Sequence, residues 1–562
     1  MKTSAPRCHI TAVILLPLLV VPFPHPAEAQ MTSSPRPTTL AGRSTVYAPS
    51  GAVATSQPLA TAAALKVLQD GGNAFDAAVA AAAVLNVVEP HMTGLGGDVF
   101  ALFWSARDRR LGGLDASGRA GSLATPDTLQ AMGLQDVPYR GAPSITVPGA
   151  LSGWVALLEE YGRLSLAEAL APAVALAEEG FPVSPIIASQ WRGTEGVLRD
   201  DPGARATYLL EGERAPGAGE WFRNPDLAET FRILGREGPG ALYGGWLGAR
   251  IVDALQDMGG FLTLEDLRDH RPEWVEPIHA DFRGYRVWEL PPAGQGIAAL
   301  QMLKILEPLD LEGMGHNSPD YLHHLIEAKK LAFADLARHV SDRDHLEGDP
   351  MALLGDEYIA GRRALLDPRR AAVRVEPGRP FQAGETVYVA VGDREGNMVS
   401  FINSVFEYFG SGVVVPGTGF VLQNRGAGFT LEEGHPNRLA PGKRPFHTLI
   451  PGFVTKDDEP LMAFGVMGGS MQPQGHVQVI LNHLVFGMDL QEAVDAPRFR
   501  HTSGTTVALE SPIPDEVRRA LSALGHDVGE TGTFGGAQVV MRLSRGWAAA
   551  SDPRKDGMAA GY

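Results

Sequence analysis

A pair of histidines and a glutamate on one predicted helix could, by residue type, hold a metal ion. Ser318-Pro319 starts a helix that runs to about Val340, with Ser as the N-cap and Pro at the first helical position. His324 and Glu327 are three residues apart on it, next to His323, and this spacing suits a shared metal ligand. No third ligand is evident, so we expect no metal and interpret these side chains as a solvated or packed helix face.

A glycine-rich segment could, by the same test, bind a dinucleotide. The stretch Thr93-Gly94-Leu95-Gly96-Gly97-Asp98-Val99-Phe100 has two of the three glycines of such a loop, but Val99 occupies the place of the third. We therefore expect a tight turn against neighbouring backbone, followed by a strand from Val99 to Trp104.

A threonine at the start of a strand is the third candidate. Residues 384–393 alternate and are rich in β-branched and aromatic side chains, which predicts a strand. The turn at 393–397 leads into a returning apolar strand at 398–406, so the two form a buried hairpin. Thr386 stands at the head of this hairpin. A threonine hydroxyl is a poor nucleophile at neutral pH and needs a base.

Helices that could support this hairpin are predicted on both sides of the glycine-rich turn. Asn73 is a suitable N-cap for a helix over 74–88 that is apolar on nearly every side and therefore buried. Amphipathic helices are expected at about 151–161 and at 166–179, the second with Ser165 as N-cap and Glu168 three residues on.

Composition narrows the class of protein. The chain has 562 residues, of which 44% are hydrophobic, so it can bury an ample core. Its formal net charge of −17 argues against nucleic acid as a partner. The single cysteine, Cys8, excludes a disulfide framework and a cysteine-based metal site.

The first 29 residues have the pattern of a secretory signal. Lys2 and Arg7 precede an apolar run from Ile10 to Val21, and Ala27-Glu28-Ala29 forms a cleavage site before Gln30. The run contains Pro17 and is too short to span a bilayer. We expect a periplasmic or secreted protein with no membrane association after the signal is removed, and a flexible lead-in over residues 30–43.

The hairpin and several later motifs together resemble the γ-glutamyltranspeptidase family of N-terminal nucleophile hydrolases. The resemblance covers roughly residues 45–562, and the order and spacing of its motifs make it specific. Those motifs are Thr386-Val387-Tyr388-Val389-Ala390-Val391, Asp393-Arg394-Glu395-Gly396-Asn397, Lys443-Arg444-Pro445, Gly468-Gly469-Ser470, Ala496-Pro497-Arg498-Phe499 and Ser551-Asp552-Pro553-Arg554-Lys555-Asp556-Gly557.

The resemblance implies that the chain cuts itself between Glu385 and Thr386. The freed α-amine of Thr386, with an unperturbed pKa of about 7.7–8.0, would then be the base for its own hydroxyl. By the same resemblance, Ser404 would hydrogen-bond the nucleophile, and the backbone N–H groups of Gly468 and Gly469 would form the oxyanion hole. No cofactor is implied, and no metal is needed for catalysis.

The substrate pocket departs from the family pattern. Phe406, Gly428 and Arg425 stand where the family binds the α-amine of a γ-glutamyl group, and Arg425 suits a carboxylate instead. His447-Thr448 replaces a pair of serines. Ser117 takes the place of the arginine that grips the α-carboxylate, so we expect Arg119, two residues on, to bind substrate from a shifted position. The segment from Gly428 to Gly442 is also short where many relatives carry a lid.

The fold and subunit organisation follow from the resemblance. We expect an α+β fold, a four-layer αββα sandwich, built jointly by a large subunit (44–385) and a small subunit (386–562). The partners would be the two fragments of the chain itself, in a heterodimer that could pair further, and a small acidic amide as substrate.

Three functions are compatible with these residues. The first is a γ-glutamyltransferase or glutathione hydrolase that passes an acyl group to water or an amine. The second is an amidohydrolase or acylase of the same fold that acts on a non-glutamyl acid amide, of the glutaryl or oxamate type. The third is a secreted binding protein without catalytic activity. Overall resemblance favours the first, the altered pocket favours the second, and the retained Thr386, Ser404, Gly468 and Gly469 disfavour the third.

Overall fold

The computed structural model describes residues 42–346, 348–375, 385–529 and 532–562, with only the backbone of Glu385. The predicted signal peptide at 1–29 lies outside the described residues, as does the predicted lead-in at 30–43 except for its last two residues. The segment 376–384 before the predicted cut also lies outside them. Residues 42–562 form one compact unit. Within the described part of the chain, no helix is both long enough and apolar enough to cross a membrane.

Two seven-stranded antiparallel sheets carry the fold. One sheet contains the predicted hairpin, and its strands in order are β19 (Met558–Gly561), β2 (Ala52–Thr55), β10 (Glu385–Gly392), β11 (Met398–Phe406), β3 (Asp98–Ser105), β4 (Arg110–Ala116) and β7 (Glu273–Val275). The strands of the other in order are β1 (Val46–Ala48), β18 (Trp547–Ser551), β17 (Ala537–Arg542), β13 (Glu459–Val466), β12 (Gly452–Lys456), β9 (Tyr285–Glu289) and β8 (Ile278–Phe282).

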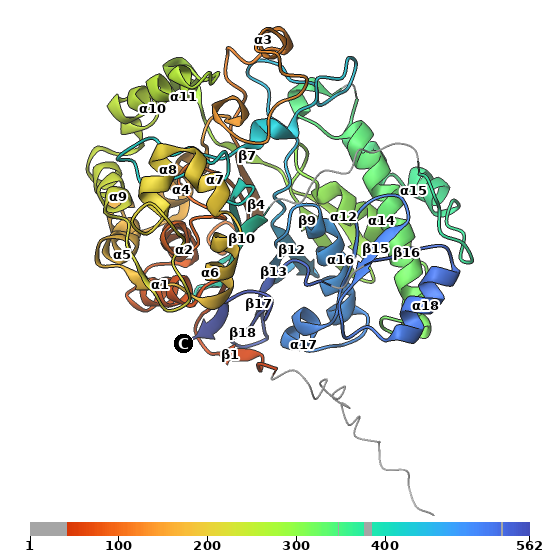
Figure 1. Cartoon of the computed structure of the whole chain (residues 1–562). Helices are drawn as coiled ribbons and strands as arrows, with labels where there is room; N and C mark the ends of the chain where they lie inside the picture. The colour runs from red at the N-terminus through yellow and green to blue at the C-terminus, as the bar shows by residue number, and fades with distance from the viewer. Residues whose placement is uncertain (1–41, 347, 376–384, 530–531) are drawn as a thin grey trace, which may run out of the picture. The chain divides into compact units, whose positions relative to one another are not determined.

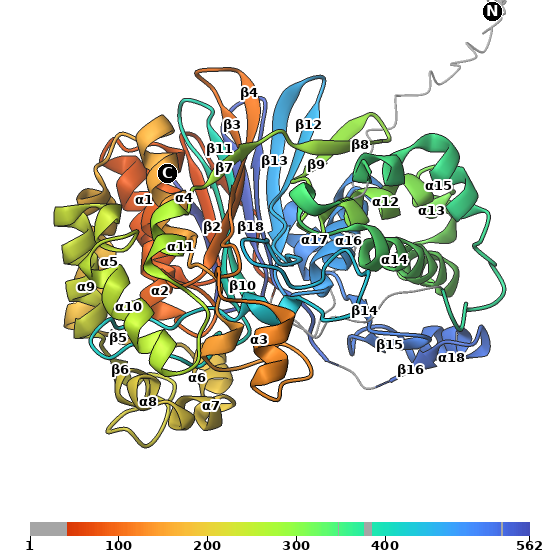
Figure 2. The ribbon, with the colours of Figure 1, turned by 90° about the horizontal axis from the view of Figure 1, so that it is seen from above.

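Helices cover the outer face of each sheet, which gives the four-layer αββα sandwich (Figure 2). The hairpin sheet is covered by α1 (Pro58–Gln69), α2 (Ala74–Val88), α4 (Ala150–Tyr161), α5 (Leu166–Glu179) and α9 (Pro225–Glu237). The other sheet is covered by α12 (Gly296–Leu306), α14 (Pro319–His339), α16 (Met471–Leu484) and α17 (Leu490–Asp495). The predicted α+β fold and its layers are therefore confirmed.

Shorter elements fill the connections between these layers. The helices are α3 (Pro126–Ala131), α6 (Pro185–Arg192), α7 (Glu195–Asp200), α8 (Pro202–Tyr208), α10 (Trp246–Asp257), α11 (Leu264–Asp269), α13 (Leu311–Met314), α15 (Asp356–Arg363) and α18 (Asp515–Ala523). A three-stranded sheet joins β14 (Phe499–His501), β15 (Thr506–Leu509) and β16 (Asp527–Val528), and β5 (Phe181–Pro182) pairs with β6 (Trp221–Phe222). Figure 1 labels β15 and β16, and Figure 2 labels all five strands.

Alternation along β10 explains why the hairpin lies at the centre of the sandwich. Side chains of a strand point alternately to its two faces. Val387, Val389 and Val391 belong to the core shared with the helices around α2, whereas Tyr388 and Ala390 belong to the core between the two sheets. Both faces of β10 are therefore buried, as the predicted buried hairpin requires.

The supporting helices begin where the sequence predicts. Asn73 and Asp76 form a capping box on α2, and every residue of α2 is buried. Ser165 and Glu168 form the same arrangement on α5, and the Ser318 side chain accepts from the Tyr321 N–H at the start of α14. These local predictions succeed because an oxygen-bearing side chain satisfies backbone donors that the first helical turn leaves open.

The C-terminal strand lies next to an early strand of the chain. β19 pairs antiparallel with β2, and β2 pairs on its other side with β10. The Tyr562 carbonyl accepts from the Ser50 and Gly51 N–H groups. The first and last strands of the segment from 386 to 562 therefore both border β2.

Candidate active site

Thr386 lies at an irregularity in the pairing of β10 with β11. Glu385 pairs with Phe406 and Val387 with Asn403, so one residue, Thr386, faces the two residues between them on β11. Such a bulge re-aims side chains locally. The Thr386 hydroxyl is buried and donates to Ser404 Oγ at 3.3 Å, and Ser404 Oγ also accepts from the Phe406 N–H at 2.8 Å. The structure thus brings together the predicted nucleophile and its predicted hydroxyl partner.

The glycine-rich turn packs against the end of the same strand. A Cβ on Gly97 would lie 2.3 Å from the Ser404 carbonyl oxygen, and one on Gly96 would lie 2.2 Å from that of Val421. Real Cβ atoms do not approach this closely, so backbone contact here requires glycine. The predicted tight turn is confirmed. It delivers Asp98, the first residue of β3, to the position paired with Ser404.

Arg425 is a fully buried guanidinium beside this pair of strands. It lies in a short 3-10 turn, η5 (Arg425–Gly428), and stacks on the Phe406 ring at 4.5 Å from its centroid. Its Nη1 donates to Thr448 Oγ1 at 2.8 Å, but Nε and Nη2 have no hydrogen-bond partner among the described residues. Burial lowers the pKa of Arg425 to about 10, so it stays charged at neutral pH.

Phe406 itself is held in an unusual conformation. Its φ is +79°, in the left-handed region that a bulky residue rarely occupies. Strained backbone of this kind persists where the surrounding structure fixes it, and it gathers at functional sites. Here it places the aromatic ring under Arg425 while its N–H reaches Ser404.

Asp98 and His447 complete a buried polar cluster around Arg425. His447 Nδ1 accepts from the Leu449 N–H at 3.2 Å, so His447 Nε2 carries the proton and donates to Asp98 Oδ2 at 3.2 Å. Asp98 Oδ2 also lies 3.7 Å from Arg425 Nε. Burial raises the pKa of Asp98 to about 7 although Arg425 opposes that rise. Burial also holds the pKa of His447 well below its usual value, so the imidazole is neutral.

Gly468 and Gly469 form a turn between β13 and α16. Both have positive φ, +116° and +55°, which glycine adopts without strain. Both are buried, and no described residue accepts a hydrogen bond from either N–H. Unpaired buried N–H groups are rare, so two in succession ahead of a helix fit a site for a developing anion. Gly465, just before this turn, packs on Tyr388 of β10.

Gln295 connects this turn to the arginine. Its side-chain Nε2 donates to the carbonyl oxygens of Gly469 at 2.8 Å and of Thr448 at 2.7 Å. Thr448 in turn accepts from Arg425. One buried amide therefore sets the spacing between the glycine turn and the guanidinium.

Arg119 lies in a different environment from the other predicted site residues. It forms ion pairs with Glu273 at 3.1 Å, Asp342 at 3.3 Å and Asp344 at 3.1 Å, and it is about one-third exposed. Its guanidinium is occupied by carboxylates of the protein. The structure therefore does not bring its side chain into the contacts that join Thr386, Ser404 and Arg425.

The residues considered as metal ligands, His324 and Glu327, do not lie together in the structure. His324 turns to the Asp320 carbonyl, whereas His323 meets Glu327 and His526, with ligand atoms within 4.8 Å of one another. These groups already bind within the protein. Glu327 accepts from Lys330 and from the Ala372 N–H, and His323 contacts His526 at 2.8 Å. We interpret the cluster as a buried hydrogen-bond network.

Two residues of the site escaped sequence reasoning, Asp98 and Gln295. Asp98 opens a strand whose eight residues are all buried, and a lone carboxylate in such a strand calls for a charged partner. Gln295 stands among glycines and prolines before an apolar helix, and that pattern gives no hint of its carbonyl contacts.

The fold, with a buried threonine at the head of a central strand, is that of an N-terminal nucleophile hydrolase. A family model for gamma-glutamyltranspeptidase matches residues 60–562. The "Glutathione hydrolase-like YwrD proenzyme" of Bacillus subtilis is 40% identical over 517 residues, covering 90% of this chain and 97% of that protein. The "Oxamate amidohydrolase proenzyme" of Klebsiella pneumoniae is 38% identical over 523 residues, with the same coverage. A cephalosporin acylase structure from Bacillus halodurans superposes with a TM-score of 0.88 at 44% identity, covering 94% of this chain and 98% of that one.

The chain therefore belongs to the gamma-glutamyltranspeptidase family, and it is an enzyme. The family resemblance predicted from the motifs is confirmed, and the alternative of a binding protein without catalytic activity is set aside.

We expect Gln295→Ala to destabilise the site region. It leaves the buried Thr448 carbonyl without its donor and removes one of the two donors to the Gly469 carbonyl, which costs on the order of 1–3 kcal/mol. Gln256→Ala is the matched control, because Gln256 also donates to a carbonyl, that of Leu262, but is exposed. Thermal unfolding of the two variants measures the difference. Equal losses would show that Gln295 does not hold the turn.

Proposed function

We propose that this enzyme cleaves the amide of an acidic acyl group through Thr386, and that the acyl carboxylate binds Arg425. The observation that carries the proposal is the buried guanidinium with two donors unused by the protein. Arginine presents such donors as a planar fork that matches a carboxylate. Phe406 places an aromatic ring, and not a polar group, at one of the positions where the family binds an α-amine. The names of an oxamate amidohydrolase and a cephalosporin acylase among its relatives agree with an acid amide other than γ-glutamyl.

The chemistry runs in two halves. In the first, the Thr386 hydroxyl oxygen attacks the amide carbon and its proton passes to the Thr386 α-amine, which a cut before Thr386 would free. The N–H groups of Gly468 and Gly469 stabilise the oxyanion. The amine leaves with the proton, and an ester of Thr386 remains. In the second, water attacks the ester, the α-amine takes and returns a proton, and the acid is released.

A γ-glutamyl amide is the second candidate substrate. Asp98 favours it, because a buried carboxylate beside the arginine could face an α-amine. Yet Asp98 already accepts from the Gly118 N–H at 3.0 Å and from His447. We propose that His447 positions Asp98 and does not contact substrate. Comparing the cleavage of glutaryl anilide with that of γ-glutamyl anilide separates the two candidate substrates, because only the γ-glutamyl anilide carries an α-amine.

We expect the purified protein to consist of two fragments, the smaller one beginning at Thr386. Thr386→Ala removes the nucleophile and should leave one chain without activity, whereas Thr418→Ala, at another buried threonine, should still be cut. Intact mass and N-terminal sequencing decide this. The same sequencing tests whether the large fragment begins at Gln30, after removal of an export signal. An uncut wild type, or an active and uncut Thr386→Ala protein, would contradict the mechanism.

We expect Arg425→Met to abolish the preference for an acidic acyl group. Hydrogen bonds to a charged group contribute about 1.5–3 kcal/mol. The ratio of kcat/KM for glutaryl anilide to that for butyryl anilide should therefore fall by roughly ten- to a hundredfold. Arg425→Lys keeps the charge but not the planar pair of donors, so its ratio should lie between those of wild type and Arg425→Met. Arg119→Gln should leave the ratio within about twofold if that side chain binds no substrate. A ratio that falls in Arg119→Gln and not in Arg425→Met would reverse the assignment.

The same ratio should depend on pH through Asp98. A carboxylate bound at Arg425 repels the Asp98 carboxylate, so binding favours protonated Asp98, whose pKa is about 7. The preference for glutaryl over butyryl anilide should therefore rise as the pH falls through about 7. The Thr386 amine acts on both substrates and cancels in the ratio. Asp98→Asn is neutral at every pH and should give a flat profile; an unchanged slope in that variant would contradict the assignment.

A further inference from the structure

A cavity of about 740 Å³ opens between α14 and the loop that follows Arg425. Its lining includes Gly428, the last residue of the turn that begins at Arg425, and Ser470, directly after Gly468 and Gly469. Arg425, Phe406 and Thr448 are not part of that lining. The cavity is therefore a second compartment beside the proposed acyl pocket. If Arg425 binds the acyl carboxylate of a substrate, the amine side of the substrate amide would extend into this cavity.

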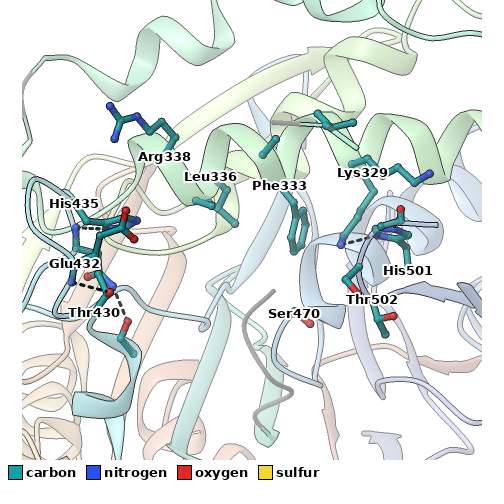
Figure 3. A pocket seen from close by; sticks show the side chains of 18 of the residues that line it. Lys329, Phe333, Leu336, Arg338, Thr430, Glu432, His435, Ser470, His501 and Thr502 are labelled. Carbon is teal, nitrogen blue, oxygen red and sulfur yellow. Dashed lines mark hydrogen bonds between the residues drawn. The ribbon is translucent and has the colours of Figure 1, made fainter. Parts of the chain in front are cut away.

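Lys329 is one of two buried lysines that line this compartment. It comes from the middle of α14, is 3% exposed, and lines the cavity. Figure 3 shows it at one end, with His501 and Thr502, while Thr430, Glu432 and His435 lie at the other end. Its Nζ lies 2.9 Å from His501 Nδ1 and 3.9 Å from the centre of the Phe333 ring.

The contacts of Lys329 leave its charge unmatched. His501 Nε2 donates to the Gly504 carbonyl at 3.0 Å, so Nδ1 accepts from Lys329 and the imidazole is neutral. Within the described ranges, no carboxylate forms an ion pair with Lys329. Its neighbour Lys330 differs, because it is paired with Glu327 at 2.7 Å. Burial, together with the charges of Arg500 and Lys330, lowers the pKa of Lys329 to about 7.

A buried ammonium without a counter-ion is costly unless an anion completes it. Two N–H donors of Lys329 remain after the bond to His501, and Phe333 supplies an apolar wall beside them. We propose that this cavity is the leaving-group subsite and that it takes an amine whose apolar body carries a carboxylate, bound by Lys329. The proposal rests on the amide-cleaving function proposed above, and it adds that the substrate is acidic on both sides of the amide.

Three substrates with one acyl group test it. Glutaryl 4-aminobenzoate and glutaryl 3-aminobenzoate carry the carboxylate on the amine side at two positions, and glutaryl anilide lacks it. We expect wild type to prefer at least one of the acids by about tenfold in kcat/KM, as a charge-assisted hydrogen bond would give. Lys329→Met keeps the length and the contact with Phe333 but removes the charge, and it should abolish that preference. Lys66→Met, at an exposed lysine, should retain it.

Failure of this inference can be told apart from failure of the proposed function. If wild type cleaves the anilide but shows no preference, or if Lys329→Met keeps the preference, the subsite is wrong and the proposed function stands. If wild type cleaves none of the three, the proposed function fails. Calorimetric titration of the processed protein with 4-aminobenzoate and 3-aminobenzoate then tests the cavity directly. Binding lost in Lys329→Met supports it, and no binding, or equal binding in both proteins, overturns it.

Discussion

The pairing of β10 with β11 is the constraint on which the rest of the site depends. Thr386 occupies the bulge in that ladder, and the same strand β11 supplies Ser404 to receive its hydroxyl and Phe406 to support Arg425. The next strand, β3, brings Asp98 opposite Ser404. The positions of Thr386, Ser404, Phe406 and Asp98 are therefore set by the register of three neighbouring strands, and a slip of one residue would turn these side chains to the opposite face.

The buried charged side chains around the site differ in how well hydrogen bonds and ion pairs satisfy them. Asp98 is satisfied by a backbone N–H and by neutral His447, while Thr448 takes only one donor of Arg425. Because isolated buried charges are unfavourable, the exceptions are informative. One is Arg425, whose Nε lies 3.7 Å from Asp98 but makes no hydrogen bond, as Nη2 makes none. The other is Lys329, which has no ion pair among the described residues.

Much of the fold could be predicted from local patterns. The hairpin, the helix starts at Asn73, Ser165 and Ser318, and the tight turn at Gly96-Gly97 all follow from short-range backbone requirements, and the structure has them where the sequence indicates. The order of strands in the two sheets could not be derived this way. It depends on contacts between residues hundreds of positions apart, such as β2 between β10 and β19. Resemblance to a family predicted the four layers but not the order of the strands.

For the candidate site too, residues that the family resemblance covers could be predicted, whereas contacts between residues distant in sequence could not. The family resemblance predicted roles for Thr386, Ser404, Gly468 and Gly469, and the structure places Thr386 within hydrogen-bond distance of Ser404. Asp98 and Gln295 act through partners distant in sequence, so no motif around them indicates their contacts. Arg119 looked suitable by position, but its side chain meets Glu273, Asp342 and Asp344, which lie more than 150 residues further along.

The place of β2 between β10 and β19 bears on the order of folding and maturation. Under the proposed cut, β2 belongs to the large fragment, and its two neighbours are the first and last strands of the small one. Separation of the fragments would break both of these ladders, together with those that join β1 to β18, β3 to β11 and β9 to β12. Before the cut, folding is an event within a single chain. After it, an unfolded protein would have to reassemble from two molecules, at a rate that depends on concentration. Cleavage before Thr386 would thus turn a reversible fold into one that is retained by its interlocked strands.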